Sequence, residues 1–245
     1  MPVLEPTSHG AADRFASALG WRHPALIFLA AALGGLLLII VGSIAAAYLL
    51  TDVIGHAPVI GSANRHFDTW LSHHRTANRT EASLIGSIAA GGVVLPIVAG
   101  LVALVCACLR KWRIAAFAVF ALAIESSAYR ATTLVFHEHR PRVHRLENLP
   151  VNASYPSGHT AASIAVYGGL VLLLTSRIRS RAVRAVAWSI AVAIPIYVAL
   201  SRMYRGMHYP LDVTGGALVG IAALCVVVFA ARAAGAADRH RRVVR

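Results

Sequence analysis

Two polar segments of this chain concentrate histidine, arginine and aspartate within an otherwise apolar sequence. They are Phe136–His159 and Ser201–Asp212. Arginine offers a planar fork of N–H donors that matches the oxygens of a phosphate group, and histidine exchanges protons near neutral pH. Both segments hold few carboxylates that would repel an anion. We therefore predict that they converge on one pocket for a phosphate-like anion.

Two histidines and one aspartate in these segments can form a reaction centre. His208 and Asp212 are four residues apart, so on a helical turn they share a face and can form a hydrogen bond. Asp212 would then fix the tautomer of His208 and leave its second ring nitrogen free to attack phosphorus. His159, in the other segment, could protonate the departing oxygen. This chemistry needs no metal ion and no cofactor.

The other polar residues of the two segments are suited to holding phosphate oxygens. Ser157 directly precedes an apolar stretch and is predicted to cap a helix whose first N–H groups attract an anion. Arg140 and Arg202 would stabilise charge on the transferring group. The alternative is that His208 and Asp212 only cap a helix and that the arginines are ordinary loop residues. The loop histidines lie among arginines without supporting carboxylates, so we predict no metal site.

Six apolar stretches must position these segments. A bilayer core about 30 Å thick is crossed by about 20 helical residues, and the stretches are rich in Ala and Leu without the alternation of strands. They are Ala25–Leu50, Leu84–Leu109, Ile114–Phe136, Thr160–Thr175, Val183–Leu200 and Val213–Ala234. We predict an all-α bundle of six transmembrane helices over residues 25–234. Residues 1–24 are expected to be a mobile cytoplasmic tail, and residues 235–245 a basic cytoplasmic tail.

Composition excludes several other classes of protein. Of 245 residues, 58% are hydrophobic and only 13% are charged, with mean hydropathy +0.66, which excludes a disordered chain. The net charge of +13 lies in short loops between apolar runs and not on a soluble basic face, so nucleic acid is not expected as a partner. The three cysteines lie inside apolar runs and are interpreted as apolar filler. The first apolar run is longer than the core of a cleaved signal peptide.

The distribution of basic residues predicts the orientation of the bundle. With a cytoplasmic N-terminus, the inside segments hold 14 basic residues and the outside loops hold 8. An excess of Lys and Arg on the cytoplasmic side is the usual pattern in membrane proteins. Both phosphate-binding segments then face the periplasm or exterior, at the outer membrane–water interface.

The motifs resemble those of the type 2 phosphatidic acid phosphatase family, which shares its site with vanadium haloperoxidases. The family pattern is K-x6-R-P, then P-S-G-H, then S-R-x5-H-x3-D. The second motif matches as Pro156-Ser157-Gly158-His159, and the third matches as Ser201-Arg202, His208 and Asp212. The resemblance covers the whole six-helix layout, with the motifs after helix three, before helix four and after helix five.

The resemblance implies a role for each matching residue. His208 would be the nucleophile that becomes phosphohistidine, with Asp212 as its orienting partner. His159 would be the general acid and later the base for water. The residues that would hold the phosphate oxygens are Arg140, Ser157, Gly158 and Arg202.

The first motif departs from the family pattern. Arg140-Pro141 matches, but the position seven residues before Arg140 is Thr133 and not lysine. One positive donor is therefore missing, which puts phosphate affinity and rate in question. Arg130 lies one helical turn before Thr133 on a similar face, and we hypothesise that Arg130 or the loop residue His137 supplies the absent charge.

These observations predict an integral membrane phosphatase of the plasma membrane that hydrolyses a phosphomonoester or pyrophosphate of a lipid. Its candidate substrates are polyprenyl pyrophosphate, polyprenyl-linked phosphosugar, phosphatidylglycerol phosphate and phosphatidate. The alternatives are a lipid phosphotransferase, a haloperoxidase, or a catalytically impaired protein that binds anionic lipid. The segment 66–75 has apolar residues at helical spacing and is interpreted as an interfacial anchor and not a lid. Glu125, in mid-helix, is expected to form a structural hydrogen bond.

Overall fold

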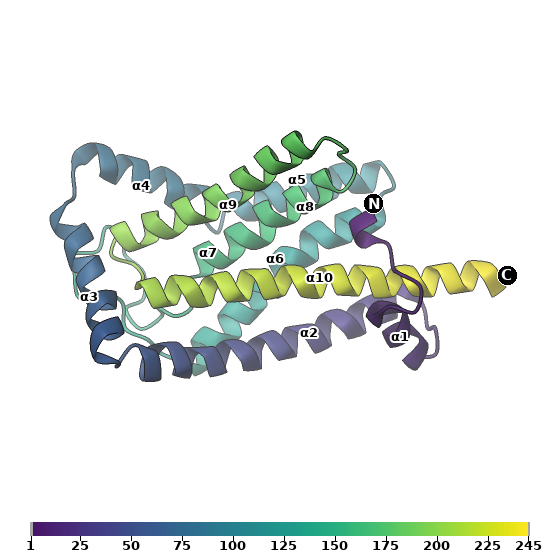
Figure 1. The fold of residues 1–245 in the computed structure, drawn as a ribbon, viewed down its shortest axis with the longest axis horizontal. Helices are drawn as coiled ribbons and strands as arrows, with labels where there is room; N and C mark the ends of the chain where they lie inside the picture. Colours follow the sequence, from purple (N-terminus) through teal and green to yellow (C-terminus); the bar gives the residue numbers. More distant parts are fainter. Residues whose placement is uncertain (1, 245) are drawn as a thin grey trace.

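The computed structural model describes residues 2–244, and every regular element in that range is helical (Figure 1). The long elements are α2 (Pro24–Ala47) with the π-helical turn η2 (Tyr48–Ile54), α4 (Ala77–Ala89), α5 (Val94–Cys108), α6 (Trp112–Val135), α7 (Gly158–Ser163) with the π-helical turn η3 (Ile164–Gly168) and α8 (Gly169–Thr175), α9 (Arg181–Tyr204) and α10 (Pro210–Val244). Five continuous stretches are long and apolar enough to cross a membrane, and the bent pair α4–α5 makes a sixth. The predicted all-α transmembrane fold is confirmed.

The second predicted span is broken. We expected one helix over Leu84–Leu109, but α4 and α5 are separated by a short break and bent by 41°. The break contains Gly91 and Gly92. Consecutive glycines favour a break because glycine loses more conformational entropy than other residues when it becomes helical. A glycine pair within a span often allows close contact between helices. Here the pair lies at a break between two helices and not within one continuous span.

Small residues let the central helices approach closely. Helix α10 runs the length of the bundle and packs against α2 and α6 (Figure 1). The core between these helices contains Phe28, Phe117 and Val227 together with many alanines. In a membrane, where lipid tails are as apolar as leucine, such close packing replaces the hydrophobic effect as the force that holds helices together.

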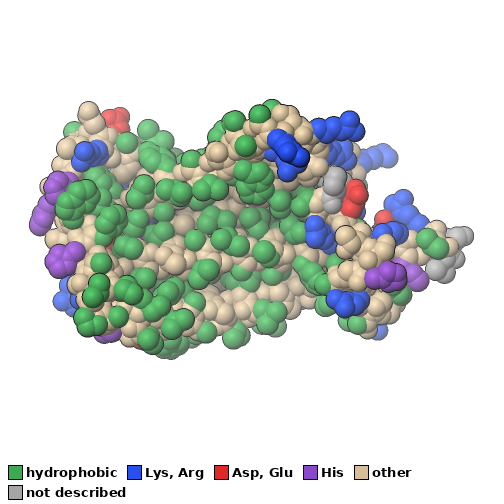
Figure 2. All heavy atoms as spheres, in the orientation of Figure 1, with side chains coloured by type: hydrophobic (Ala, Val, Ile, Leu, Met, Phe, Trp, Pro, Cys, Tyr) green, Lys and Arg blue, Asp and Glu red, His purple; other side chains and the backbone are tan. Residues whose placement is uncertain are grey.

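The flanks of the bundle are apolar. Leu37, Leu38 and Leu101 are each more than half exposed, and hydrophobic side chains cover the flanks over the length of the bundle (Figure 2). Lys and Arg side chains on this face gather mainly at the end near the C-terminus. An apolar belt with polar ends is the surface expected of a multi-pass membrane protein.

The two segments expected to be tails are folded against each other. The short elements η1 (Pro2–Leu4) and α1 (Ala11–Ala18) both pack on α10, which continues as helix to Val244. The ring of Trp21 stacks on His240 at 4.4 Å between centroids. Residues 2–24 and 235–244 therefore form a cap on one end of the bundle, and residues 2–24 are folded where we expected a mobile tail.

The opposite end, which we call the α3 end, is built from polar segments. Helix α3 (Pro58–His73) lies across it (Figure 1), with Trp70 54% exposed. Arg75, just after α3, donates to the carbonyl oxygen of Tyr204 at 2.8 Å and to that of His144 at 2.7 Å. The two polar segments singled out from the sequence both connect helices at this end.

Candidate active site

A cavity of about 300 Å³ at the α3 end collects residues from both polar segments. Its polar lining comprises Arg140, Gly158, His159, Arg202 and His208, together with Glu125, Ser126 and Tyr129 from α6. Its apolar lining includes Leu95, Pro96 and Leu122, and Gly91 and Gly92 at the α4–α5 break also border it. The predicted convergence of His159, His208 and Arg202 on one pocket is therefore present in the structure. The cavity is polar at one side and apolar at the other.

His208 lies in the link between α9 and α10 and is 3% exposed. Its Nδ1 is 2.7 Å from the carbonyl oxygen of Ser154. A carbonyl oxygen only accepts, so Nδ1 carries the proton and Nε2 holds the free lone pair. Burial lowers the pKa of His208 well below its ordinary value, and the charges of Arg140 and Arg202 lower it further. The ring is therefore neutral at neutral pH, as a nucleophile requires.

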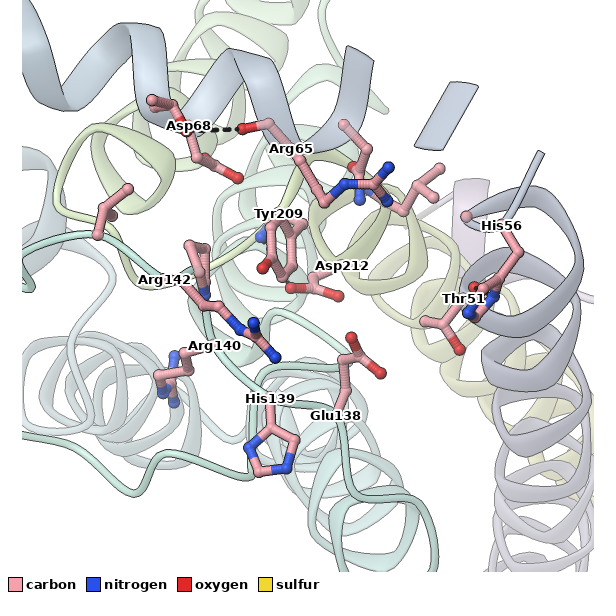
Figure 3. A pocket seen from close by; sticks show the side chains of 16 residues that line it. Thr51, His56, Arg65, Asp68, Glu138, His139, Arg140, Arg142, Tyr209 and Asp212 are labelled. Atoms are coloured by element: carbon pink, nitrogen blue, oxygen red, sulfur yellow. Dashed lines mark hydrogen bonds between the residues drawn. The ribbon is translucent and has the colours of Figure 1, made fainter. Parts of the chain in front are cut away.

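The predicted hydrogen bond between Asp212 and His208 is wrong. Asp212 Oδ2 instead accepts the Ser154 hydroxyl at 2.5 Å and the Tyr209 backbone N–H at 2.8 Å. The prediction assumed one helical turn, but α10 begins only at Pro210, so His208 lies outside the helix. Ser154 joins the two, because its hydroxyl binds Asp212 while its carbonyl holds His208. Asp212 itself borders a second cavity of about 590 Å³ (Figure 3).

The Pro156-Ser157-Gly158-His159 motif forms the start of α7. Ser157 stands at the N-cap position, but its hydroxyl pairs with that of Thr160 at 3.0 Å and caps no backbone N–H. Ser157 is fully buried and does not border the cavity, whereas Gly158 and His159 do. A Cβ atom at Gly216 would lie 2.4 Å from the Ser157 carbonyl oxygen. The absence of a side chain at Gly216 therefore lets α10 pack directly against the backbone of Ser157.

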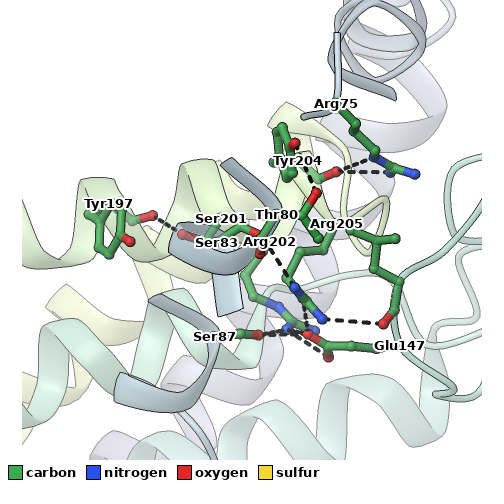
Figure 4. Close-up of polar contacts among 11 residues, drawn as sticks. Arg75, Thr80, Ser83, Ser87, Glu147, Tyr197, Ser201, Arg202, Tyr204 and Arg205 are labelled. Carbon is green, nitrogen blue, oxygen red and sulfur yellow. Dashed lines mark hydrogen bonds and ion pairs between the residues drawn. The ribbon is translucent and has the colours of Figure 1, made fainter. Parts of the chain in front are cut away.

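Arg202 divides its donors between the protein and the cavity. Its Nη1 donates to both Glu147 oxygens at 2.8 Å and contacts the Ser87 hydroxyl (Figure 4). Its Nε and Nη2 are buried and have no hydrogen-bond partner among the described residues. An unpaired buried guanidinium edge is costly. Because Arg202 borders the cavity, these two donors are suited to an anion with phosphate geometry.

Glu147 anchors this arginine from the long loop before α7. It also accepts from Arg205 Nε at 2.5 Å (Figure 4). Burial by itself raises the pKa of Glu147, but the Arg202 charge and the hydrogen bonds from Arg202, Ser87 and Arg205 outweigh it and lower the pKa to about 2. Sequence reasoning missed Glu147, since no motif distinguishes it from other loop carboxylates.

Glu147→Gln is expected to destabilise the protein by about 3 kcal/mol, because Arg202 then keeps a buried charge without its carboxylate. A folded-state pKa below the ordinary value of 4.5 means that this stabilisation is present above about pH 4.5 and is lost as the pH falls toward about 2. Thermal unfolding in detergent should therefore show a difference between wild type and variant that is largest at neutral pH and shrinks below pH 4.5.

The matched control for that experiment is Asp238→Asn. Asp238 pairs with Arg242 at 3.2 Å on the exposed end of α10, and an exposed pair contributes little to stability. A Tm change in Glu147→Gln no larger than in this control would contradict the anchoring role of Glu147.

Arg140 is held by three backbone carbonyl groups. Its Nε, Nη1 and Nη2 donate to Pro150, Met207 and Ala153 at 2.8, 2.5 and 2.8 Å. Burial, and then the charge of Arg202, lower its pKa to about 10, so it stays charged at neutral pH. One N–H on each terminal nitrogen is left over. Arg140 thus ties the long loop to the His208 link while it borders the cavity.

The hypothesis that Arg130 replaces the missing lysine is wrong in this structure. Arg130 is exposed and does not border the cavity, and His137 is also exposed outside it. The hydroxyl of Thr133 donates to the Arg130 carbonyl oxygen at 3.0 Å. The face of α6 toward the cavity runs instead through Leu122, Glu125, Ser126 and Tyr129, which is the spacing of one helical face. Arg130 lies about 100° around the helix axis from Tyr129, at the border of this face, and its side chain is exposed.

Two further residues of α6 border the cavity. Sequence reasoning missed Tyr129 and treated Glu125 as structural. The Tyr129 ring lies against Gly158, where an added Cβ would be 3.1 Å from it. Glu125 accepts from the Ser126 hydroxyl at 3.0 Å, as expected, but its Oε1 has no partner within residues 2–244. The sequence did carry a signal for both residues, because polar residues at three- and four-residue spacing on an apolar span form one polar face of a helix.

Comparison with known proteins identifies relatives of this chain. Residues 114–235 match the family model of the PAP2 superfamily. A segment of 75 residues is 41% identical to an undecaprenyl-diphosphatase of Sulfolobus acidocaldarius, over 31% of this chain and 32% of the relative. A segment of 93 residues is 32% identical to undecaprenyl-diphosphatase BcrC of Bacillus subtilis, over 36% of this chain and 43% of the relative. The matches thus span less than half of either curated relative.

A solved structure extends the similarity to the whole fold. The PAP2-type phosphatidylglycerolphosphate phosphatase of Bacillus subtilis superimposes with a TM-score of 0.65 and 18% sequence identity. The alignment covers 84% of this chain and 97% of that protein. At this identity the comparison concerns the fold alone.

Proposed function

Since this chain belongs to the PAP2 superfamily, we propose that it is a membrane phosphatase that releases phosphate from a lipid, with a polyprenyl diphosphate as the best-supported substrate. The observation that carries this proposal is the shared cavity of His159, His208 and the unpaired edge of Arg202. The two undecaprenyl-diphosphatases among the relatives favour the diphosphate over the other candidate lipids.

The proposed reaction proceeds in two steps on one phosphorus atom. His208 Nε2 attacks, the bond to the lipid oxygen breaks, and His159 gives its proton to that oxygen. In the second step His159 takes a proton from water, which attacks the phosphohistidine and releases inorganic phosphate. Arg202, Arg140 and the backbone N–H groups at Gly158 stabilise the charge on the equatorial oxygens. Ser157 stabilises the first turn of α7 through its hydrogen bond with Thr160.

Asp212 acts on His208 through Ser154 in this proposal. It accepts from the Ser154 hydroxyl and the Tyr209 N–H, which fixes the carbonyl group that orients the imidazole. The Nδ1 proton stays on His208, and the hydrogen bond to the carbonyl oxygen stabilises the positive charge that develops on the ring during attack.

The lipid character of the substrate follows from the other side of the cavity. Leu95, Pro96 and Leu122 line it beside the polar residues, so that a headgroup at the histidines leaves its tail against apolar side chains. The bilayer then delivers both parts in position, which lowers the entropic cost of reaction. The excess of basic residues at the opposite end supports a site that faces the exterior of the plasma membrane.

A phosphate-release assay tests this function. Purified protein is given polyprenyl diphosphate, polyprenyl phosphosugar, phosphatidylglycerol phosphate or phosphatidate, each with a chelator and with His208→Ala as control. We expect the highest kcat/KM with polyprenyl diphosphate and no effect of the chelator. A strict metal requirement, or release that is equal in His208→Ala, would contradict the mechanism.

One observation favours a second candidate, a protein that binds anionic lipid without turnover. Thr133 stands where the family has lysine, which removes a positive charge near the phosphate. Saturable binding of polyprenyl diphosphate without phosphate release, unchanged in His208→Ala, would favour this candidate.

Tyr129→Phe is expected to lower kcat/KM by about 10- to 100-fold, because a hydrogen bond to a charged group contributes roughly 1.5–3 kcal/mol. Tyr129 borders the cavity from α6 and its ring lies beside Gly158, so we expect its hydroxyl to donate to a phosphate oxygen in place of the missing lysine. Steady-state kinetics on the same lipid measure the change.

Arg130→Ala is the matched control, since Arg130 is adjacent in sequence but exposed. Its kcat/KM should equal that of wild type. The opposite pattern, with loss in Arg130→Ala and none in Tyr129→Phe, would restore the arginine as the substitute cation.

A further inference from the structure

The second cavity at the α3 end is a distinct and larger space, of about 590 Å³. Its walls come from α3, from the end of η2, from the loop after α6 and from the link before α10 (Figure 3). Arg140 borders both cavities, whereas His159 and His208 border only the first. The proposed reaction therefore takes place in the first cavity and needs no ligand in the second.

Asp68 is the unexplained group in its wall. It is 1% exposed, and neither carboxyl oxygen has a hydrogen-bond partner among the described residues. Its side chain extends from α3 toward Tyr209 (Figure 3). Burial raises the pKa of Asp68 to about 8, and the charge of Asp212 contributes to the rise. Buried carboxyl groups in native proteins are almost always hydrogen-bonded, but Asp68 has no such partner among the described residues.

The charged residues elsewhere in the lining indicate whether the missing partner is an anion, a cation or an uncharged molecule. Glu138 and Asp212 border the cavity and would repel an anion, whereas Arg65, Arg140 and Arg142 border it too and would repel a cation. No group of three or more His, Cys, Asp or Glu side chains within residues 2–244 is arranged to hold a metal ion. An uncharged ligand with several hydroxyl groups meets both signs, because each hydroxyl donates to carboxylates and accepts from guanidinium groups.

We propose that the second cavity binds the hydroxyl groups of a sugar or polyol, with Asp68 as the principal hydrogen-bonding group. Its volume lies within the range of about 300–1,000 Å³ that is typical of small-ligand sites. The ligand is either free in the aqueous phase or the headgroup of a glycolipid, and the experiment separates these sources. The proposal does not depend on the proposed phosphatase activity, since binding is measured without turnover.

Titration calorimetry on the purified full chain tests the proposal with glucose, N-acetylglucosamine and myo-inositol as free probes. A second arm uses nanodiscs with or without a monoglucosyl diacylglycerol. Spermidine, magnesium chloride and inorganic phosphate are the charged comparison probes. We expect saturable binding of at least one hydroxyl-rich probe, either free or lipid-linked, that is tighter than binding of the charged probes at this site.

Two variants and one control connect that binding to the cavity. Asp68→Leu should weaken it at least tenfold, and Arg142→Gln should weaken it as well, although Arg142 is exposed and its loss leaves folding intact. Asp52→Asn, an exposed carboxylate at the same end that does not border the cavity, should have no effect. Absence of saturable binding to every hydroxyl-rich probe would overturn the proposal. Binding that is unchanged in both Asp68→Leu and Arg142→Gln, or tighter binding of a charged probe that both variants abolish, would overturn it too.

Discussion

His208→Ala is expected to lower kcat for phosphate release by on the order of 10⁴-fold or more, because the variant has no group that can form the covalent intermediate. His208 is the only imidazole in the cavity whose Nδ1 is held by a backbone carbonyl, with Nε2 left free among the described residues. Water would then have to attack the lipid phosphate directly, with only Arg202 and its neighbours to stabilise the transition state. Phosphate release under saturating lipid measures the loss.

A trapping experiment separates loss of the nucleophile from loss of the fold. Rapid quenching of wild-type protein with ³²P-labelled substrate at alkaline pH should retain label on histidine, and His208→Ala should retain none. His144→Ala is the matched control, because this histidine is exposed in the loop after α6 and does not border the cavity. Label on a residue other than His208, or equal label in His208→Ala, would contradict its assignment as nucleophile.

His159→Ala is expected to lower kcat/KM on a lipid substrate by about 10²–10⁴-fold, the range typical of general acid catalysis. His159, the second residue of α7, borders the same cavity as His208. A lipid alkoxide or lipid phosphate leaves slowly without a proton. The leaving group of an aryl phosphate such as p-nitrophenyl phosphate is p-nitrophenolate, a stable anion that needs no proton, so the first step should tolerate the loss of His159.

The comparison between the two substrates is therefore the measurement. The ratio of wild-type to variant rate in the single-turnover burst should be large for the lipid and close to one for the aryl phosphate. Label should also accumulate on His208 in the variant, because His159 is the base for the second step as well. Equal losses on both substrates would indicate that His159 binds phosphate and does not transfer a proton.

Local sequence signals predicted the membrane spans and the end of the bundle at which the motif residues lie. In lipid, an apolar run of about 20 residues forms a helix, because only a helix lets a single segment satisfy all its backbone hydrogen bonds internally. Five of the six spans are continuous in the structure. The motifs placed His159, His208 and Arg202 at the same end of the bundle, since connections on one side of a membrane must meet there. The Gly91-Gly92 break was not predicted, because hydropathy measures side chains and not backbone continuity.

Contacts between distant segments were beyond the reach of sequence reasoning. Glu147 and Arg202 lie 55 residues apart, and nothing in the sequence around Glu147 marks it as the partner of a buried arginine. Asp212 and His208 are close in sequence, yet Ser154, 58 residues before Asp212, decides how they are connected. The choice between Tyr129 and Arg130 depended on the rotation of α6 about its axis, which the packing of α6 against α5 and α10 sets.

By itself the sequence determined that the protein is a helical membrane bundle and which histidines and arginines gather at one end, because hydropathy and spacing act along the chain. Only the tertiary structure decided which edge of Arg202 stays free, how His208 is held and which face of α6 meets the cavity. It also decided that the two expected tails pack together and that Asp68 is buried without a partner. These properties depend on hydrogen bonds and close contacts between residues far apart in the chain, and no local pattern encodes such pairings.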